Sequence, residues 1–182
     1  VIEKANQDQE DKAVISALAV HYNEIGNGIG VHKTPEVYGA FPTDPYSHTP
    51  AHRGAQQPGM TGQVKEDVLT RKGELGLNVQ EGKLTFKPVL LNKNQFLQQE
   101  ETVRFIDFEN NQFDITLAKG SLAFTVCQVP IIYKMADKNQ IEVKYSNNEI
   151  ETISSLTLSQ EHSQKIFKRT GEIIQLTVCI VF

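Results

Sequence analysis

The residues best suited to binding chemistry are concentrated in one stretch, Phe41–Gln63. It holds four of the seven prolines and two of the five histidines, and its only formal charges are Asp44 and Arg53. Disordered connectors are usually rich in charge or in glycine and serine. This stretch instead mixes aromatic with hydrogen-bonding side chains, which is typical of a long ordered loop that carries function. We therefore expect it to contribute to a polar binding surface.

The candidate substrate-binding residues are seven residues of this stretch: His48, Arg53, Gln56, Gln57, Thr61, Gly62 and Gln63. The arginine and the two glutamines beside it offer planar donors that could bracket a sugar or a carboxylate, or could equally satisfy carbonyl groups of the loop itself. The last three residues open a helix expected over 61–71. A helix N-terminus presents unpaired N–H groups and about half a positive charge, so it suits an anion or a sugar hydroxyl.

The two histidines of the stretch do not predict a metal site. His48 and His52 have a spacing that would place both rings on one face of a helix, but Pro45 and Pro50 argue against a helix there. No glutamate follows the first histidine, as it does in the zinc-protease motif. We expect histidines that form hydrogen bonds, with no metal and no cofactor.

No catalytic residue can be assigned from the sequence. Glu66 and Asp67 are adjacent, so on a helix they point about 100° apart and are expected to complement its positive end instead of acting as an acid/base pair. Ser47, Ser121 and Cys127 lack the context of a nucleophile elbow. A small independent hydrolase is therefore unsupported.

Length and charge limit the function further. A chain of 182 residues can hold one good core, or one core and an appendage. The 18 basic and 22 acidic residues give a net charge of −4 without a basic stripe, which argues against nucleic-acid binding. Apolar runs are too short for a membrane span.

Cys127 and Cys179 lie far apart in apolar runs, so we favour two buried free thiols over a bridge, and the compartment, cytoplasmic or periplasmic, stays open.

The N-terminal part predicts one amphipathic helix. The chain opens without an initiator methionine or a signal peptide, so we expect that a segment was removed or that the chain is a fragment. Residues 1–8 lack periodicity, whereas apolar residues at spacings of three and four predict a helix from about Glu10 to Asn23, capped by Asp8 and ended by glycines from Gly26. One helix cannot fold alone. Its apolar face needs a partner, either the rest of a longer polypeptide or a second copy of the chain.

After Gly76 the hydrophobic period changes from that of helices to two, which predicts strands. Turn residues separate three hairpins, at Glu81-Gly82, Asn110-Asn111 and Asn147-Asn148. A strand near Leu122–Val126 follows the second of them, Pro130 is expected to bar a central strand, and the last strand runs through 174–182. We predict a mainly β fold: an antiparallel β-sandwich over 76–182, preceded by two helices and the long ordered loop over 1–75.

Two further expectations concern side chains of the β region. The aromatic residues at strand spacing are predicted to be core residues instead of a carbohydrate platform: Phe105, Phe108, Phe113 and Phe124. The segment Gln160–Phe167 is expected to form an exposed loop or helical turn, with His162 in solvent.

The order of several motifs resembles a known protein family. The segments are Gly59-Met-Thr-Gly-Gln-Val64, Gly73-Glu-Leu-Gly76, the strand Glu81–Pro88 and Leu90-Leu91, preceded by Tyr38–His48. This order is similar to the junction in the cellobiose and chitobiose phosphorylase family, where an (α/α)6 barrel gives way to a C-terminal β-sandwich. It also resembles the ends of large bacterial proteins described as glycoside hydrolases or as cellobiose-phosphorylase-like. The resemblance covers residues 10–92 and extends to the remaining sheet only in general character.

The resemblance implies that residues 1–75 are the helical and loop remnant of a catalytic barrel and that 76–182 form its β-sandwich. The Thr61-Gly62 pair would lie at the family's phosphate site, where a small residue usually follows; here Gln63 follows, so hydrolysis and phosphorolysis both stay open. The family's catalytic acid lies on an earlier helix, which this chain does not contain, so no catalytic residue carries over. The implied partners are the rest of the polypeptide and an oligosaccharide or a sugar phosphate. The alternative is a stand-alone carbohydrate-binding or protein-interaction module of sandwich type.

Overall fold

A computed structural model describes residues 2–28 and 68–182. The chain forms two compact units, Val1–Gly73 and Glu74–Phe182. Within the described residues of the first unit, helices α1 (Ile2–Gln7) and α2 (Lys12–Gly28) follow each other, and the helical stretch that begins the second described range runs over 68–74. No helix among the described residues is both long and apolar enough to cross a membrane.

The predicted N-terminal helix is confirmed, with different ends. Helix α2 begins after Asp11, whose Oδ1 accepts a hydrogen bond from the backbone N–H of Ala13 at 2.8 Å. The predicted cap, Asp8, instead closes α1, because its N–H donates to the carbonyl of Lys4 at 2.8 Å. Residues 1–8 lack periodicity in the sequence, but 2–7 form α1. That segment is rich in helix-forming residues but is too short to reveal a period.

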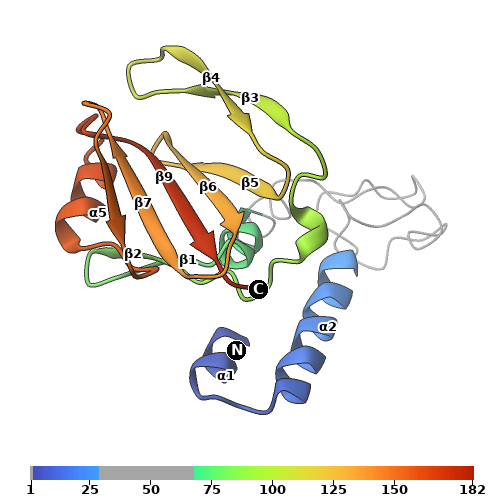
Figure 1. The fold of residues 1–182 in the computed structure, drawn as a ribbon. Helices are drawn as coiled ribbons and strands as arrows, with labels where there is room; N and C mark the ends of the chain where they lie inside the picture. The colour runs from blue at the N-terminus through green and yellow to red at the C-terminus, as the bar shows by residue number, and fades with distance from the viewer. Residues whose placement is uncertain (1, 29–67) are drawn as a thin grey trace, which may run out of the picture. The chain divides into compact units, whose positions relative to one another are not determined.

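The second unit is built from strands, so the prediction of a mainly β chain is confirmed (Figure 1). Two hairpins form separate two-stranded sheets, β1 (Leu77–Gln80) with β2 (Lys83–Phe86) and β3 (Glu101–Ile106) with β4 (Gln112–Leu117). A short 3-10 helix, η1 (Lys93–Gln95), lies between them. A five-stranded sheet follows, in the order β5 (Ser121–Val126), β6 (Val129–Met135), β9 (Ile173–Ile180), β7 (Gln140–Tyr145) and β8 (Ile150–Ile153). Helix α5 (Gln160–Phe167) packs on β2 and β9.

The three predicted hairpin turns are confirmed. Glu81 and Gly82 have φ of 52° and 72°, Asn110 has φ of 66° and Asn148 has φ of 67°. Two-residue hairpins such as β1–β2 require positive φ, longer hairpin loops such as those of β3–β4 and β7–β8 commonly have one residue with it, and glycine and asparagine adopt it most readily. These residues therefore mark the ends of β1–β2, β3–β4 and β7–β8 correctly.

The prediction that Pro130 bars a central strand is wrong. Pro130 is the second residue of β6, which lies between β5 and β9. Cys127 and Gln128, with φ of 50° and 69°, form the turn from β5 to β6, and Pro130 pairs with Thr125. In such a hairpin the second pair from the turn is not hydrogen-bonded. Pairing with β9 begins only at Ile131, so the N–H that proline lacks is not needed on either side.

The five-stranded sheet is mixed instead of wholly antiparallel. Strands β6 and β9 pair in parallel, from Ile131 opposite Leu176 to Met135 opposite Ile180, while the other pairings are antiparallel. The chain between these two strands contains the β7–β8 hairpin and α5, which supplies the crossover that a parallel pair needs. The arrangement of the unit as a sandwich stays a prediction.

The core of the second unit lies between the five-stranded sheet and the β1–β2 hairpin. Tyr133 of β6 is fully buried, its ring meets Phe86 and Phe124 edge-on, and its hydroxyl donates to the carbonyl of Leu75. Buried Ser163 of α5 accepts from the N–H of Leu84 at 2.9 Å. These contacts join α5, the five-stranded sheet, the β1–β2 hairpin and the segment that enters β1.

The backbone turn that leads into β1 depends on Gly76. The helical stretch over 68–74 is followed by a turn in which Gly76 has φ of +66°, and the Gly76 carbonyl accepts from the N–H of Lys87 at 2.8 Å. A Cβ atom at this position would lie 2.0 Å from the carbonyl carbon of Lys87. Only glycine fits both the left-handed geometry and this close approach of two backbones.

Candidate functional site

The seven candidate substrate-binding residues lie outside the described residues: His48, Arg53, Gln56, Gln57, Thr61, Gly62 and Gln63. The same holds for the histidine pair His48 and His52, for Ser47 and for the adjacent acids Glu66 and Asp67. Their predicted roles stay predictions. The described residues contain another site that the sequence did not reveal.

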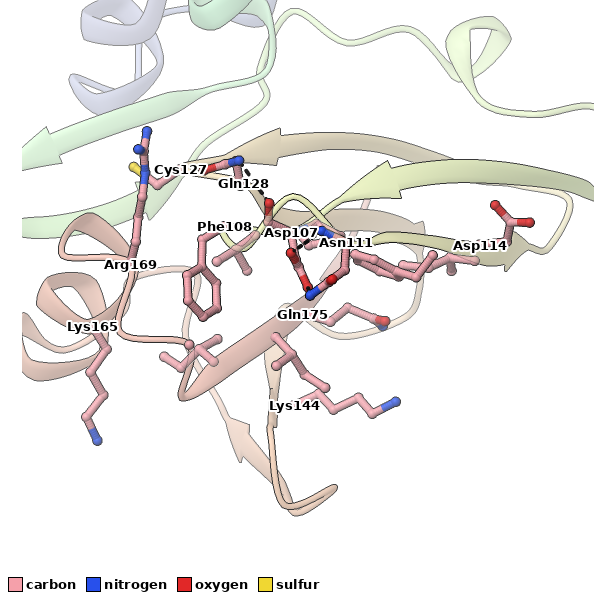
Figure 2. Close-up of a pocket in the computed structure, with 17 residues that line it drawn as sticks. Asp107, Phe108, Asn111, Asp114, Cys127, Gln128, Lys144, Lys165, Arg169 and Gln175 are labelled. Atoms are coloured by element: carbon pink, nitrogen blue, oxygen red, sulfur yellow. Dashed lines mark hydrogen bonds between the residues drawn. The ribbon is translucent and has the colours of Figure 1, made fainter.

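This site is a cleft of about 380 Å³ in the second unit, which we call the hairpin cleft (Figure 2). It lies where the tip of the β3–β4 hairpin meets the β5–β6 turn, strand β7, the end of α5 and the start of β9. Its volume falls in the range of small-molecule sites. The side chains that matter for its chemistry are Asp107, Phe108, Asn111, Asp114, Gln128, Lys144, Lys165, Arg169 and Gln175.

Hydrogen bonds within the chain hold the hairpin tip at the cleft in place. Oδ1 of Asp107 accepts from the N–H groups of Glu109 and Asn111, both at 2.8 Å, and Oδ2 accepts from Nδ2 of Asn111 at 3.0 Å. Desolvation raises the pKa of Asp107, but these hydrogen bonds outweigh it and the pKa lies below its ordinary value. Gln128 of the neighbouring turn donates through Nε2 to the Asp107 carbonyl at 3.0 Å, which ties the two turns together.

An aromatic ring is exposed in this cleft. Phe108 was predicted to be a core residue, but it is 43% exposed. It lies two residues beyond Ile106, the last residue of β3, so the alternation that buries Phe105 no longer applies to it. The ring lies against Gly171, where a Cβ atom would come within 2.6 Å of Cζ of Phe108. The prediction holds for Phe105, which is buried and stacks on Phe113 with ring centroids 6.0 Å apart, and for Phe124, which packs against the core.

The charged groups of the cleft differ in whether they are paired. The carboxylate of Asp114 accepts two hydrogen bonds from Arg104, at 2.9 and 3.2 Å, which lower the pKa of Asp114. Lys165 lies 3.1 Å from Oε1 of Glu161 and 3.1 Å from Oε2 of Glu172. Lys144 and Arg169 form no ion pair with any described residue.

A second polar cluster surrounds His162, beside a separate open depression lined by Glu151, Ser159 and His162. The expectation that this histidine is solvated is wrong: its side chain is 14% exposed. Nδ1 lies 2.7 Å from Oγ of Ser159, and Nε2 lies 2.9 Å from the hydroxyl of Tyr145 and 3.2 Å from Oε2 of Glu151. The cluster forms because Gln160–Phe167 is a helix whose N-cap, Ser159, also accepts from the N–H of His162 at 3.1 Å. Ser159 acts as the cap of α5, and the contacts of His162 with Tyr145 and Glu151 connect the helix to β7 and β8.

The cluster makes a pH-dependent prediction. Desolvation and the 2.6 Å hydrogen bond that Tyr145 donates to Glu151 raise the pKa of Tyr145 to about 12. Because the folded pKa lies above the unfolded value of about 10, this contribution to stability is complete below pH 10 and is lost as the pH rises toward 12. The difference in tyrosinate absorbance between the wild type and Tyr145→Phe should therefore show a group that titrates near 12.

The matched control is Glu151→Gln, which removes the accepting carboxylate while leaving the ring of Tyr145 in place. The pKa of Tyr145 should fall toward its ordinary value in this variant. If Tyr145 titrates near pH 10 in the wild type, the folded-state hydrogen bond to Glu151 is refuted.

The cysteines and acids of the described residues do not form a further site. Cys127 and Cys179 are both free thiols, as predicted, but each is half-buried, and Cys127 lies in the β5–β6 turn instead of within a strand. Desolvation raises the pKa of Cys179. Over residues 2–28 and 68–182, no group of three or more His, Cys, Asp or Glu side chains is placed to hold a metal ion.

The hairpin cleft was missed because its residues come from distant parts of the sequence. Asn111, Gln128, Lys144 and Arg169 lie in different elements, and no local spacing connects them. The one available signal was the predicted hairpin turn at Asn110-Asn111, which lies close to Phe108 in the sequence, but Phe108 itself was predicted to be a core residue of the strand. Comparison of the whole chain with models of known protein families and with curated proteins gives no match.

Proposed function

We propose that this chain is the C-terminal part of a carbohydrate-active protein, a glycoside hydrolase or glycoside phosphorylase, and that Glu74–Phe182 is its non-catalytic β unit. In this proposal the unit supports a helical barrel to which residues 1–73 belong, and it binds saccharide in the hairpin cleft. The motif order from Gly59 to Leu91 motivates the assignment to this class. The catalytic acid would lie in a part of the protein that precedes this chain.

The observation that carries saccharide binding is the exposed ring of Phe108 in a cleft bordered by amide side chains. A sugar ring has an apolar C–H face and polar hydroxyl edges. The ring of Phe108 suits the first, and the second suits the amides of Gln128 and Gln175, as donors and acceptors, and the amide oxygen of Asn111, as an acceptor. Pockets that combine an apolar floor with a few polar groups are the usual small-molecule sites.

The proposed sandwich has a specific basis in the packing. The β1–β2 hairpin is extended by the segment before α5, since the N–H of Phe86 donates to Leu156 and that of Leu158 donates to Leu84, both at 2.9 Å. This layer meets the five-stranded sheet through Phe86 and Tyr133. Two packed layers of strands are the minimum that a sandwich requires.

The binding part of the proposal can be tested with the full 182-residue chain on a glycan array, followed by calorimetry on the glycans retained. Phe108→Ala should weaken binding about tenfold, because it removes the ring face that contacts the sugar. Gly171→Ala should act in the same direction by displacing that ring. Ile150→Ala is the control, since it trims an exposed apolar side chain outside the cleft. Retention of no glycan, or equal binding by all variants, would refute saccharide binding in the cleft.

A stand-alone binding module is the second candidate. The observation that favours it is that every described residue lining the hairpin cleft belongs to Glu74–Phe182, so one unit supplies the whole described lining. The two candidates differ in the reading frame that precedes Val1. A long helical sequence with a central carboxylic acid would support the carbohydrate-active enzyme, and its absence would support the module.

A further inference from the structure

We propose that the outer edge of β8 binds an extended, basic peptide segment, which adds a further strand to the five-stranded sheet. β8 is the last strand in the order of that sheet, and β7 is the one strand among the described residues that pairs with it. The surface lies outside the hairpin cleft and does not depend on a saccharide there.

The backbone of β8 presents two residues outward. The N–H of Tyr145 donates to the carbonyl of Glu149 at 2.9 Å, so these two residues form a hydrogen-bonded pair next to the turn of the β7–β8 hairpin. Hydrogen-bonded pairs alternate with non-hydrogen-bonded ones along an antiparallel ladder. Ile150 and Thr152 therefore direct their N–H and C=O groups away from β7. No described residue pairs with these four groups, which an extended peptide would satisfy.

Lysine and proline, which commonly block pairing at an edge strand, are absent around β8. The chain contains no lysine, arginine or proline between Lys144 and Lys165. The opposite edge of the sheet, β5, is covered at one end, where the N–H of Leu97 donates to the carbonyl of Ser121 at 2.8 Å. Ile150 is 63% exposed, the highest fraction among the exposed large hydrophobic side chains described in the second unit. This edge is therefore both open and partly apolar.

An open depression lies beside β8, on the face of the sheet where Glu151 contacts His162 of α5. Its described lining includes Ile153 of β8, Leu158 and the hydroxyl-bearing residues of the segment that leads into α5. Side chains alternate between the two faces of a strand, so every second side chain of an added strand would project into this depression. Peptides bound to a sheet edge gain affinity from main-chain hydrogen bonds and specificity from such pockets.

The charge of the edge selects a basic partner. Oε2 of Glu151 accepts from the hydroxyl of Tyr145 and lies 3.2 Å from Nε2 of His162, whereas Oε1 has no hydrogen bond from a described residue. The hydrogen bond from Tyr145 lowers the pKa of Glu151, which keeps the carboxylate ionised at neutral pH. Glu149 adds a second negative charge, the depression contributes one positive charge from Lys83, and the one acid and one base of β7 cancel. A lysine or arginine opposite Glu151 would thus meet an open carboxylate oxygen at an edge of negative charge.

A second copy of β8 does not suit the same edge. Two copies related by two-fold symmetry would pair Ile150 of one with Thr152 of the other, which sets the two Glu151 side chains directly opposite each other. A shift by two residues sets Glu149 opposite Glu151, and the reverse shift pairs Ile150 with Ser154, beyond the end of the strand. Like charges directly opposite each other destabilise a strand pair. The occupant is therefore a different segment, with basic residues opposite the two glutamates.

The test is an NMR titration of the full chain with three capped heptapeptides. The first is Thr-Val-Thr-Lys-Val-Lys-Thr, which in antiparallel register sets its lysines opposite Glu149 and Glu151. The second has glutamate in place of both lysines. The third is the basic peptide N-methylated at its second threonine and its second valine, the residues that would face Thr152 and Ile150.

The basic peptide should bind about tenfold more tightly than the acidic one, with its largest amide shifts at Ile150 and Thr152. The methylated peptide keeps both charges but lacks the N–H groups that pair with the edge, so it should lose this binding. Equal binding of the basic and acidic peptides would overturn the basic partner. Equal binding of the methylated peptide and its parent, or no shift with the basic peptide at millimolar concentration, would overturn strand addition.

Variants of the protein locate the effect. Thr152→Pro removes an outward N–H and leaves the hydrogen bonds to β7 in place, so it should weaken binding of the basic peptide about tenfold; the methylated peptide makes the same test on the unaltered strand. Glu149→Gln and Glu151→Gln should each reduce the advantage of the basic peptide, most clearly at low salt. Glu101→Gln removes an exposed acid of β3 and should change nothing. Wild-type affinity in Thr152→Pro would show that the peptide binds elsewhere.

Discussion

Replacing Gly76 with alanine should lower the free energy of unfolding of Glu74–Phe182 by about 3 kcal/mol, the sum of a left-handed backbone penalty and a steric clash. The clash is with backbone and not with a movable side chain: the new Cβ would meet the carbonyl carbon, the carbonyl oxygen and the next nitrogen of the chain at Lys87 and Pro88, within 2.0 to 2.3 Å. The backbone would have to separate, and the hydrogen bond from Lys87 to Gly76 would be lost. Chemical denaturation followed by circular dichroism measures the change.

Gly82→Ala is the matched control for this prediction. Gly82 also has positive φ, +72°, but the nearest atoms to its absent Cβ belong to the flexible side chain of Gln160 at 3.5 Å. Only the backbone penalty of about 1 kcal/mol applies there. Equal losses in the two variants would show that the close approach at Gly76 contributes nothing.

Shortening Tyr133 should have the second large effect. Tyr133→Phe should lower the free energy of unfolding by about 2 kcal/mol, because it leaves the carbonyl of buried Leu75 without its donor. Tyr133→Ala should lower it by about 4 kcal/mol, since a cavity then replaces the ring. Burial also raises the pKa of Tyr133, so its hydroxyl stays protonated and keeps donating.

The pair of Tyr133 variants separates hydroxyl from ring, because the phenylalanine variant keeps the edge-on contacts with Phe86 and Phe124. Urea titrations of both variants give the two contributions. Should Tyr133→Phe be as stable as the wild type, the hydrogen bond to Leu75 has no net value. The ring contribution would then be judged from the alanine variant alone.

The β hairpins could be predicted from the sequence where their turns contain residue types that favour positive φ. Asparagine and glycine adopt positive φ at little cost, so Glu81-Gly82, Asn110-Asn111 and Asn147-Asn148 located three hairpins correctly. The turn at Cys127-Gln128 has the same geometry, but neither residue type is favoured there. It therefore left no signal in the sequence.

Strand β6 illustrates the opposite difficulty. Its residues Val129 to Tyr133 are all buried and do not alternate, which is typical of a strand covered on both faces. Pro130 masked this signal, because the rule that excludes proline from central strands ignores where pairing with each neighbour begins. The register of both neighbours, which lies outside the local sequence, decides whether the proline is tolerated.

The candidate site was less predictable than the fold. The exposure of Phe108 depends on β3 ending at Ile106, and strand ends are the least certain part of a sequence-based prediction. The unpaired state of Lys144 and Arg169 depends on which carboxylates other basic residues take, such as Glu161 and Glu172 by Lys165. Such competition is settled only by the tertiary fold.

The central position of β9 determines the order in which the five-stranded sheet can assemble. Hairpins β5–β6 and β7–β8 pair residues that are close along the chain, so each can form early. Only β9 joins them, in parallel to β6 and antiparallel to β7. Until that long-range docking occurs, both hairpins carry open edges of unpaired backbone N–H and C=O groups that other unfolded copies can extend. Conditions that delay the docking of β9 will therefore favour aggregation over folding, even where the finished sheet is stable.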